Sequence, residues 1–117
     1  MATGKSFEDL VVYQKALQFV MSIYGLISAL PKDDEFNLAN LTKQAAVSIT
    51  TNIGEGSKKD SPAEKKRYLN NALDALSECQ YYLNFIREQG YAETAYLMPE
   101  AAEVNTLLEE HIQNSEE

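Results

Sequence analysis

The sequence is poor in the residues that build covalent or metal-bound sites. Its 117 residues include one cysteine, one histidine and no tryptophan. A single cysteine excludes an internal disulfide and a thiolate metal cluster. A di-metal bundle site needs Glu-x-x-His pairs, but Leu108 stands three residues before His111. We therefore expect no metal, no cofactor and no enzymatic activity, with Cys79 in the core and His111 on the surface near a helix C-terminus.

Long hydrophobic runs are also missing. The wholly apolar runs are only a few residues long, as in residues 10–13, so we expect no membrane span. Residues 1–6 carry no apolar signal core, which favours a cytoplasmic protein. A hydrophobic fraction of 44% and a charged fraction of 24% are ordinary for one soluble domain, which we place at residues 1–117.

Lysine and arginine are absent from the last quarter of the chain. The net charge is −8, yet residues 1–87 hold ten basic and ten acidic residues and sum to zero. Everything after Arg87 supplies eight acidic residues and no Lys or Arg. This acidic element is either a solvated helix face that aids solubility or a docking surface for a basic protein partner.

Hydrophobic periodicity predicts an all-α protein. Apolar residues recur every three or four positions in four segments, at about 8–30, 37–54, 62–89 and 93–114. Short connections favour an antiparallel up-down-up-down four-helix bundle. Ser61, Pro62 and Glu64 form a capping box at the third helix. Gly54 and Gly56 are expected to end the second helix in a left-handed conformation. Pro99 either kinks the fourth helix or marks its start.

The first predicted helix has more apolar surface than one core requires. One seam consists of Leu10, Tyr13, Leu17, Val20, Tyr24 and Ile27, and a second of Val12, Ala16, Phe19, Ile23, Leu26 and Leu30. Together the seams cover roughly 200° of the helix, whereas a core-facing stripe needs only about 100°. The excess indicates a subunit interface or an unusually wide buried face.

Three polar residues form a candidate polar site: Asn52, Glu55 and Glu78. Glu55 is placed at a helix C-terminus, where a carboxylate meets the unfavourable end of the helix dipole. Viewed down the axis of the third helix, Glu78 falls between Tyr82 and Phe85. A partly buried carboxylate there needs a partner. The structural alternative is that each acid is an ion pair or cap, because such networks also perturb acids without chemistry.

A basic cluster surrounds the turn between the second and third helices. It consists of Lys58, Lys59, Lys65, Lys66 and Arg67. These residues are candidate contacts to the phosphates of RNA or DNA, or else a solvated helix entry. The overall acidity argues against a nucleic-acid binder, which usually carries a basic footprint.

Several motifs resemble one bacterial family of four-helix bundles. They are residues 7–16 (FEDLVVYQKA), Ile23-Tyr24, residues 45–49 (AAVSI), residues 52–56 (NIGEG), and the segment from Tyr68-Leu69 to Glu78. In this order and spacing they are similar to proteins encoded in intervening sequences of 23S ribosomal RNA genes. The resemblance covers roughly residues 7–91.

The resemblance implies an antiparallel bundle that assembles as a ring-like homo-oligomer, a pentamer, with no established enzymatic activity. A related branch contains accessory proteins of diversity-generating retroelements, which bind nucleic acid and a reverse transcriptase. The chain departs from the family pattern at three places: Gly54 in place of Ala, Lys43-Gln44 in place of two arginines, and Asp74-Ala75 in place of Gly-Ser. The lost arginine and the acidic fourth helix weaken the implication of nucleic-acid binding. We therefore expect a non-enzymatic self-associating scaffold, with a nucleic-acid-binding accessory protein as the alternative.

Overall fold

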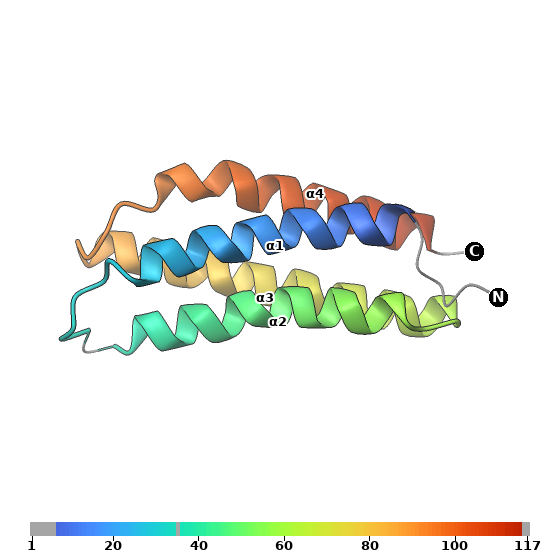
Figure 1. Cartoon of the computed structure of the whole chain (residues 1–117), viewed down its shortest axis with the longest axis horizontal. Coiled ribbons are helices and arrows are strands. Elements are labelled where there is room, and N and C mark those ends of the chain that lie inside the picture. The colour runs from blue at the N-terminus through green and yellow to red at the C-terminus, as the bar shows by residue number, and fades with distance from the viewer. Residues whose placement is uncertain (1–6, 35, 116–117) are drawn as a thin grey trace.

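Four helices run up and down along one long axis. The computed structural model describes residues 7–34 and 36–115 and measures 50 × 21 × 17 Å (Figure 1). The helices are α1 (Phe7–Ile27), α2 (Leu38–Ser57), α3 (Pro62–Glu88) and α4 (Met98–Asn114), and the 3₁₀ turn η1 (Ala95–Leu97) precedes α4. The all-α bundle expected from periodicity is confirmed.

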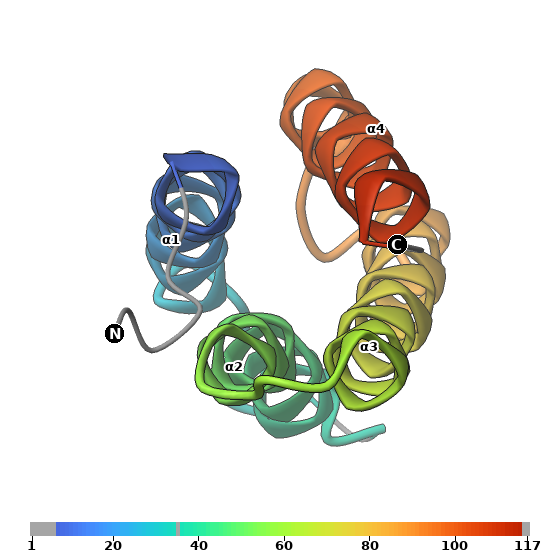
Figure 2. The same ribbon diagram turned by 90° about the vertical axis from the view of Figure 1, so that its right-hand side faces the viewer.

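The helices sit at the corners of a square when viewed along the bundle (Figure 2). α2 packs against α1 and α3, and α4 also packs against α1 and α3. In the described part of the chain, α1 and α3 form no packed pair, so they are diagonal across the bundle. Surfaces on the outer sides of α1 and α3 therefore face different directions.

One of the two apolar seams of α1 lies in the core, whereas the other lies mostly on the outside. Val12, Ala16, Phe19, Ile23 and Leu26 are buried against the other helices. In the other seam, Val20 is buried and Ile27 is half-buried, whereas the remaining members are exposed. One stripe of about 100° is thus sufficient for this core, and the excess apolar surface lies on the outside.

The two glycines of the Gly54-Glu55-Gly56 motif do not end α2. The helix continues through both to Ser57, so the prediction of a left-handed terminus there is wrong. Within the described residues, positive φ occurs at Asn37 (57°) and Gly90 (76°). Gly56 instead serves close packing, because a Cβ there would lie 3.2 Å from the Cβ of Tyr68.

The other helix ends follow local chemistry. The predicted cap of α3 is confirmed, since the Ser61 hydroxyl accepts a hydrogen bond from the backbone N–H of Glu64 at 3.3 Å. Pro99 lies in the first turn of α4. Of the two predicted roles, it therefore marks the start of this helix and does not kink it. α1 ends at Ile27, three residues earlier than predicted, and residues 28–30 form a turn.

Candidate interaction surfaces and a buried polar cluster

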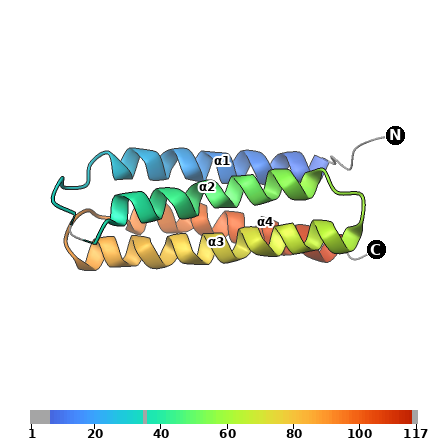
Figure 3. The ribbon, with the colours of Figure 1, turned by 90° about the horizontal axis from the view of Figure 1, so that it is seen from below.

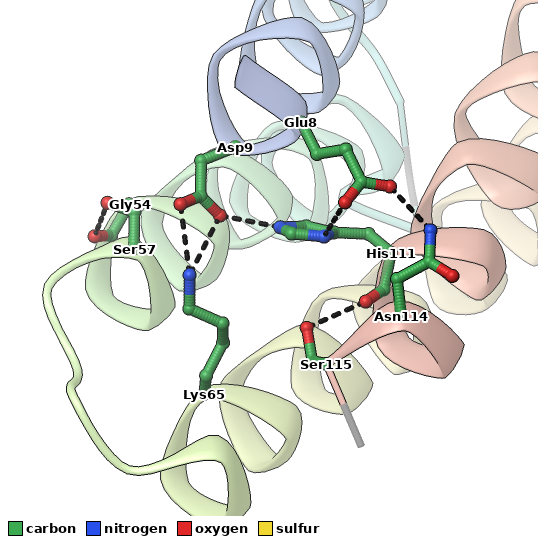
Figure 4. Close-up of polar contacts among 8 residues, drawn as sticks. All are labelled: Glu8, Asp9, Gly54, Ser57, Lys65, His111, Asn114 and Ser115. Atoms are coloured by element: carbon green, nitrogen blue, oxygen red, sulfur yellow. Dashed lines mark hydrogen bonds and ion pairs between the residues drawn. The ribbon is translucent and has the colours of Figure 1, made fainter. Parts of the chain in front are cut away.

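A buried carboxylate ties three helices together at one end of the bundle (Figure 4). Asp9 of α1 is 3% exposed. The Lys65 ammonium of α3 donates to both of its oxygens, at 2.9 and 3.2 Å. His111 of α4, also 3% exposed, places Nε2 2.5 Å from Asp9 Oδ1. Because one acid meets two basic groups, the cluster compensates the cost of burying a charge.

A second layer of contacts surrounds His111. Glu8 Oε1 lies 3.6 Å from His111 Nδ1, and the other oxygen of Glu8 accepts a hydrogen bond from the Asn114 amide at 2.8 Å. The Ser115 hydroxyl donates to the carbonyl oxygen of His111 at 2.7 Å. The expectation that His111 is a surface residue is therefore wrong.

The cluster does not have the layout of a nucleophilic catalytic site. Nucleophilic catalysis needs a hydroxyl or thiol within hydrogen-bond reach of its base. The nearby Ser57 hydroxyl instead donates to the Gly54 carbonyl at 2.8 Å, and Ser115 donates to a backbone carbonyl. In residues 7–34 and 36–115, no group of three or more metal-ligating side chains is positioned to hold an ion. The contacts of Asp9 with His111 and Lys65 instead stabilise the packing of α4 and α3 against α1.

Asn52, Glu55 and Glu78 each find a partner three or four residues away in the chain. The Asn52 amide donates to the Ser48 carbonyl at 2.8 Å. Glu55 lies 3.6 Å from the Lys58 ammonium. These contacts are those of a structural amide and a helix-end ion pair.

Glu78 lies far along the bundle from Glu55. Gly56, next to Glu55, packs on Tyr68, and Glu78 follows Tyr68 by ten residues. At 1.5 Å per residue, the two acids are separated by about 15 Å along the axis. Glu78 is exposed and accepts a hydrogen bond from the Tyr82 hydroxyl at 3.1 Å. The structure thus does not bring the three candidate residues into one site.

Cys79 occupies the core, as predicted. Its side chain is fully buried, and desolvation, with a smaller contribution from the nearby charge of Glu78, raises the pKa of the thiol to about 12. The thiol therefore stays protonated at neutral pH and behaves as a small apolar side chain.

The basic turn is only partly available to a ligand. Lys65 points inward to Asp9, and Lys58 is paired with Glu55. The Lys59 ammonium lies 5.2 Å from the centre of the Tyr68 ring, and the Arg67 guanidinium lies 4.8 Å from it. Of the predicted phosphate contacts, Lys59 and Arg67 thus both lie against one half-buried aromatic ring, while Lys66 is half-buried.

The outer side of α1 exposes a row of large apolar side chains. This α1 stripe consists of Leu10, Tyr13, Leu17, Met21 and Tyr24, which are 38–62% exposed. Its Tyr24 ring lies 5.7 Å from the Lys43 ammonium of α2. The opposite edge of α1 is held to α4 by Lys15–Glu103 at 3.4 Å and Ser22–Glu100 at 3.0 Å. The stripe therefore lies on the side of α1 that adjoins α2.

Within the part of the chain that the structure describes, one helix could cross a membrane by length and composition alone. Residues Glu8–Ile27 meet the length and hydropathy expected of a span, although one third of that segment is buried inside the bundle. Core helices of soluble proteins and signal sequences pass the same test. The finding reflects the same surplus of apolar side chains that forms the α1 stripe.

A second apolar surface lies at the end of the bundle where α3 terminates. This α3 aromatic patch consists of Phe36, Tyr81 and Phe85, with Phe36 contributed by the loop before α2. The rings of Phe36 and Phe85 are 5.1 Å apart, and those of Tyr81 and Phe85 are 6.3 Å apart. Tyr81 is 62% exposed and Phe36 is 42% exposed, so the α3 aromatic patch is accessible.

The outward face of α2 is polar and slightly hollowed. A shallow open depression of about 420 Å³ is lined by Asn40, Lys43, Gln44, Val47, Ser48 and Thr51. These residues recur at helical spacing along one helix, and Lys43 is the single titratable member. The lining has the character of a helix-packing face and not of a catalytic pocket.

Known proteins agree with this architecture. The sequence matches the family described as 23S rRNA-intervening sequence protein over residues 8–110. It is also similar to a crystal structure of a protein with unknown function from the S23 ribosomal protein family of Bacteroides thetaiotaomicron. That likeness has a TM-score of 0.83 and 27% identity, and it covers 92% of this chain and 99% of that chain. No curated protein matches the chain. Neither description indicates an enzyme, and the chain belongs to the 23S rRNA-intervening sequence protein family.

Proposed function

We propose that the protein is a non-enzymatic scaffold that associates with copies of itself through the α1 stripe. The exposure of this stripe is the observation that supports the proposal. A large apolar or aromatic side chain carries on the order of 200 Å², so five of them at these exposures present about 450 Å². The largest apolar patch on a monomeric protein is typically about 300–600 Å² and is often functional.

The spacing of the stripe favours another helix as the occupant. Leu10, Tyr13, Leu17 and Tyr24 follow the repeat of three and four residues that packs helices in coiled coils. A helix that lies on a membrane instead carries many Lys or Arg residues on its polar face. α1 has Lys15 alone, which is paired with Glu103, and the net charge of −8 opposes binding to anionic lipid.

The experiment compares two glutamate substitutions one residue apart on α1. Leu17→Glu places a carboxylate in the stripe, whereas Gln18→Glu places it on the exposed polar side. At micromolar concentration, wild type and Gln18→Glu should each have a molar mass of at least twice the 13.1 kDa of one chain. Leu17→Glu should have the mass of the monomer. The family resemblance implies a ring of five copies, and the same measurement would then give five times the mass of one chain.

Two outcomes would contradict the proposal. One is a monomeric wild type, and the other is a Leu17→Glu variant that associates as well as wild type. Circular dichroism should show that both variants remain helical. Sedimentation with anionic and zwitterionic vesicles tests the membrane alternative, and we expect the protein to stay in the supernatant.

Nucleic-acid binding at the basic turn is a second candidate function. The observation in its favour is that Lys59 and Arg67 both lie close to the Tyr68 ring, a combination of cations and an aromatic that suits single-stranded nucleic acid. The lysine at position 65 is not part of this proposal, because it is committed to Asp9.

Fluorescence anisotropy with a single-stranded RNA at low salt tests this candidate. Binding should weaken steeply as salt is added and should be lost in Lys59→Glu/Arg67→Glu, while Lys32→Glu, at an exposed lysine near the far end, should bind like wild type. Absence of binding by wild type at low salt would contradict it.

A further inference from the structure

The polar cluster around His111 lies where the ends of all four helices meet. The start of α1, the end of α2, the start of α3 and the end of α4 lie at one end of the molecule (Figure 3). His111 is in the last turn of α4 and is buried. It is the single histidine of the chain, and histidine is the side chain that ordinarily changes charge between pH 5 and 8.

Both ring nitrogens of His111 face carboxylate groups of α1. Nε2 contacts Asp9 Oδ1, and Nδ1 lies 3.6 Å from Glu8 Oε1. Among the described residues, the buried Nδ1 has no hydrogen-bond partner. A neutral imidazole has one N–H and one bare lone pair, whereas an imidazolium has two N–H groups. Either neutral tautomer therefore turns a lone pair towards a carboxylate, and only the imidazolium offers a proton to both.

The balance of charge favours the same form. The contacts join Glu8 and Asp9 of α1 with Lys65 of α3 and His111 of α4. With a neutral imidazole, these side chains carry one more negative than positive charge, and with an imidazolium they are balanced. Because Asp9 and His111 are buried, water screens the excess charge only from the side of Glu8. The C-terminal end of a helix, where His111 stands, also favours a cation.

The neighbouring charged groups on the other packed elements do not alter this balance. On α2, Glu55 and Lys58 pair with each other at 3.6 Å. On α3, Lys66 is half-buried, and on α4, Glu110 next to His111 is exposed. These four groups sum to zero charge. The protonation of the ring is therefore governed by the two carboxylates of α1 that face it.

The end of α4 depends on polar contacts more than the rest of the helix does. Leu108 is fully buried, and after it Ile112 is the single apolar side chain of α4 and is half-buried. The other contacts of this end with α1 are those of His111 and a hydrogen bond from the Asn114 amide to Glu8 at 2.8 Å. A change at His111 should therefore act first on this end.

We propose that His111 is a pH-sensitive latch, which as an imidazolium holds the end of α4 against α1. When the ring loses its proton, a lone pair faces a carboxylate inside the protein, and this contact is unfavourable. The last turn and a half of α4 then separates from α1, while the apolar core farther along the bundle stays packed. The latch is independent of the proposed self-association, since the α1 stripe lies on the side of α1 that adjoins α2.

The direction of the pH effect follows from these contacts. The carboxylates of Glu8 and Asp9 hold the proton on His111 in the folded chain, whereas water surrounds the ring in the unfolded chain. Stabilisation by the imidazolium is therefore present on the acidic side and is lost as the pH rises. Carboxylates ordinarily ionise near pH 4, so a comparison between about pH 6 and pH 8 changes the ring and leaves them charged.

NMR of the single histidine tests its protonation directly. In ¹⁵N-labelled protein, the chemical shifts of Nδ1 and Nε2 distinguish the imidazolium from both neutral tautomers. At about pH 7, where histidine in an unfolded chain is largely neutral, the native ring should be mainly imidazolium. The same protein unfolded in urea should show the neutral ring. A native ring that is as neutral as the unfolded one would contradict the latch.

His111→Gln tests the consequence for stability, because an amide can still donate to Asp9 but does not titrate. Between about pH 6 and pH 8, the ratio of folded to unfolded wild type in urea should fall about threefold or more relative to this variant. Hydrogen exchange, corrected for the intrinsic rate, should show lost protection at residues 109–114 of wild type over the same range. Residues 69–86 should keep their protection. Equal pH dependence of wild type and His111→Gln would overturn the proposal.

Two further variants complete the experiment. His111→Gln/Gln113→His is the matched control, because it moves the histidine to an exposed position two residues away, and it should be as insensitive to pH as His111→Gln. Glu8→Gln keeps an acceptor for Asn114 and removes the charge beside Nδ1, so its ring should lose the proton at a lower pH than that of wild type. If His111→Gln does not fold, the ring titrations of wild type and Glu8→Gln decide, and identical titrations would contradict the latch.

Discussion

Two neighbouring residues at the start of α1 reverse the usual distribution of polarity. Asp9 is 3% exposed, whereas Leu10 is 53% exposed. The carboxylate is inside because Lys65 and His111 bind it from two other helices. The leucine is outside, and it begins a row of apolar side chains along the whole helix.

The difference between Asp9 and Leu10 shows which part of the molecule is still able to bind a partner. At the closed end around Asp9, polar groups bind one another and hold three helices together. Along the α1 stripe, large apolar groups face water, which is unfavourable unless another surface covers them. The polar Asn-Ile-Gly-Glu-Gly motif belongs with the closed regions, since its amide and carboxylate are engaged locally.

The largest effect is expected from breaking the closed end. Asp9→Ala leaves Lys65 and His111 in the interior without their shared carboxylate. Removal of one partner from a buried charge pair typically costs about 3–5 kcal/mol. Urea denaturation followed by circular dichroism, at fixed protein concentration, should show this loss. Asp74→Ala, at an exposed carboxylate, should change stability by less than about 0.5 kcal/mol.

A smaller loss is expected from overfilling the contact beside the closed end. The Cβ of a residue at position 56 would meet the Tyr68 Cβ at 3.2 Å and the Lys65 carbonyl at 3.4 Å. Gly56→Val should force α2 and α3 apart and cost about 1–3 kcal/mol in the free energy of unfolding. Unchanged stability would show that the approach of the helices at Gly56 is not tight.

Leu10→Ser should affect association and leave folding nearly intact. About half of the Leu10 residue is exposed in the isolated subunit, and covering this exposed half in an interface is worth about 1.4 kcal/mol. The dissociation constant should therefore rise about tenfold, while the urea midpoint of the isolated subunit stays close to wild type. A large loss of folding stability would contradict the assignment of Leu10 to an outer surface.

Gly54→Ala should stabilise the protein slightly. Among the described residues, apart from the adjoining turns of the helix itself, no atom lies within 4 Å of a Cβ at this position, and Gly54 is inside α2. Alanine is favoured over glycine in a helix interior by about 1 kcal/mol. A gain of about 0.5–1 kcal/mol in urea denaturation is expected, in contrast to the loss at Gly56 two residues away.

The smallest effect at neutral pH concerns Cys79, whose titration changes stability only in alkaline solution. Burial raises the pKa of this thiol from 9.0 to about 12. The unfolded chain loses the proton near pH 9, whereas the folded chain retains it. The stabilisation of the folded state by the protonated Cys79 thiol is therefore fully present below pH 9 and is lost as the pH rises from 9 towards 12. At pH 8, a thiol reagent should react with native protein far more slowly than with unfolded protein.

The sequence predicted the helices and their core because both depend on local spacing. Val12, Ala16 and Phe19 recur with the helical period, and they are buried. The extent of α2 was mispredicted because a glycine pair often ends a helix, whereas Gly56 is needed for a contact with Tyr68 that the local sequence does not contain.

The polar cluster was missed although the signal was present. Asp9 continues the spacing of the buried residues Val12 and Ala16, and His111 continues that of Val104 and Leu108. Polarity led to the expectation that His111 faces water. Its burial depends on a carboxylate 102 positions away in the chain, and single-helix patterns do not show which distant residues meet.

The molar mass of the wild-type protein in solution tests the central claim most directly. The α1 stripe is proposed to be a subunit interface, so light scattering at micromolar concentration should give a multiple of 13.1 kDa that falls to 13.1 kDa in Leu17→Glu. A wild-type mass of 13.1 kDa at that concentration would contradict the claim.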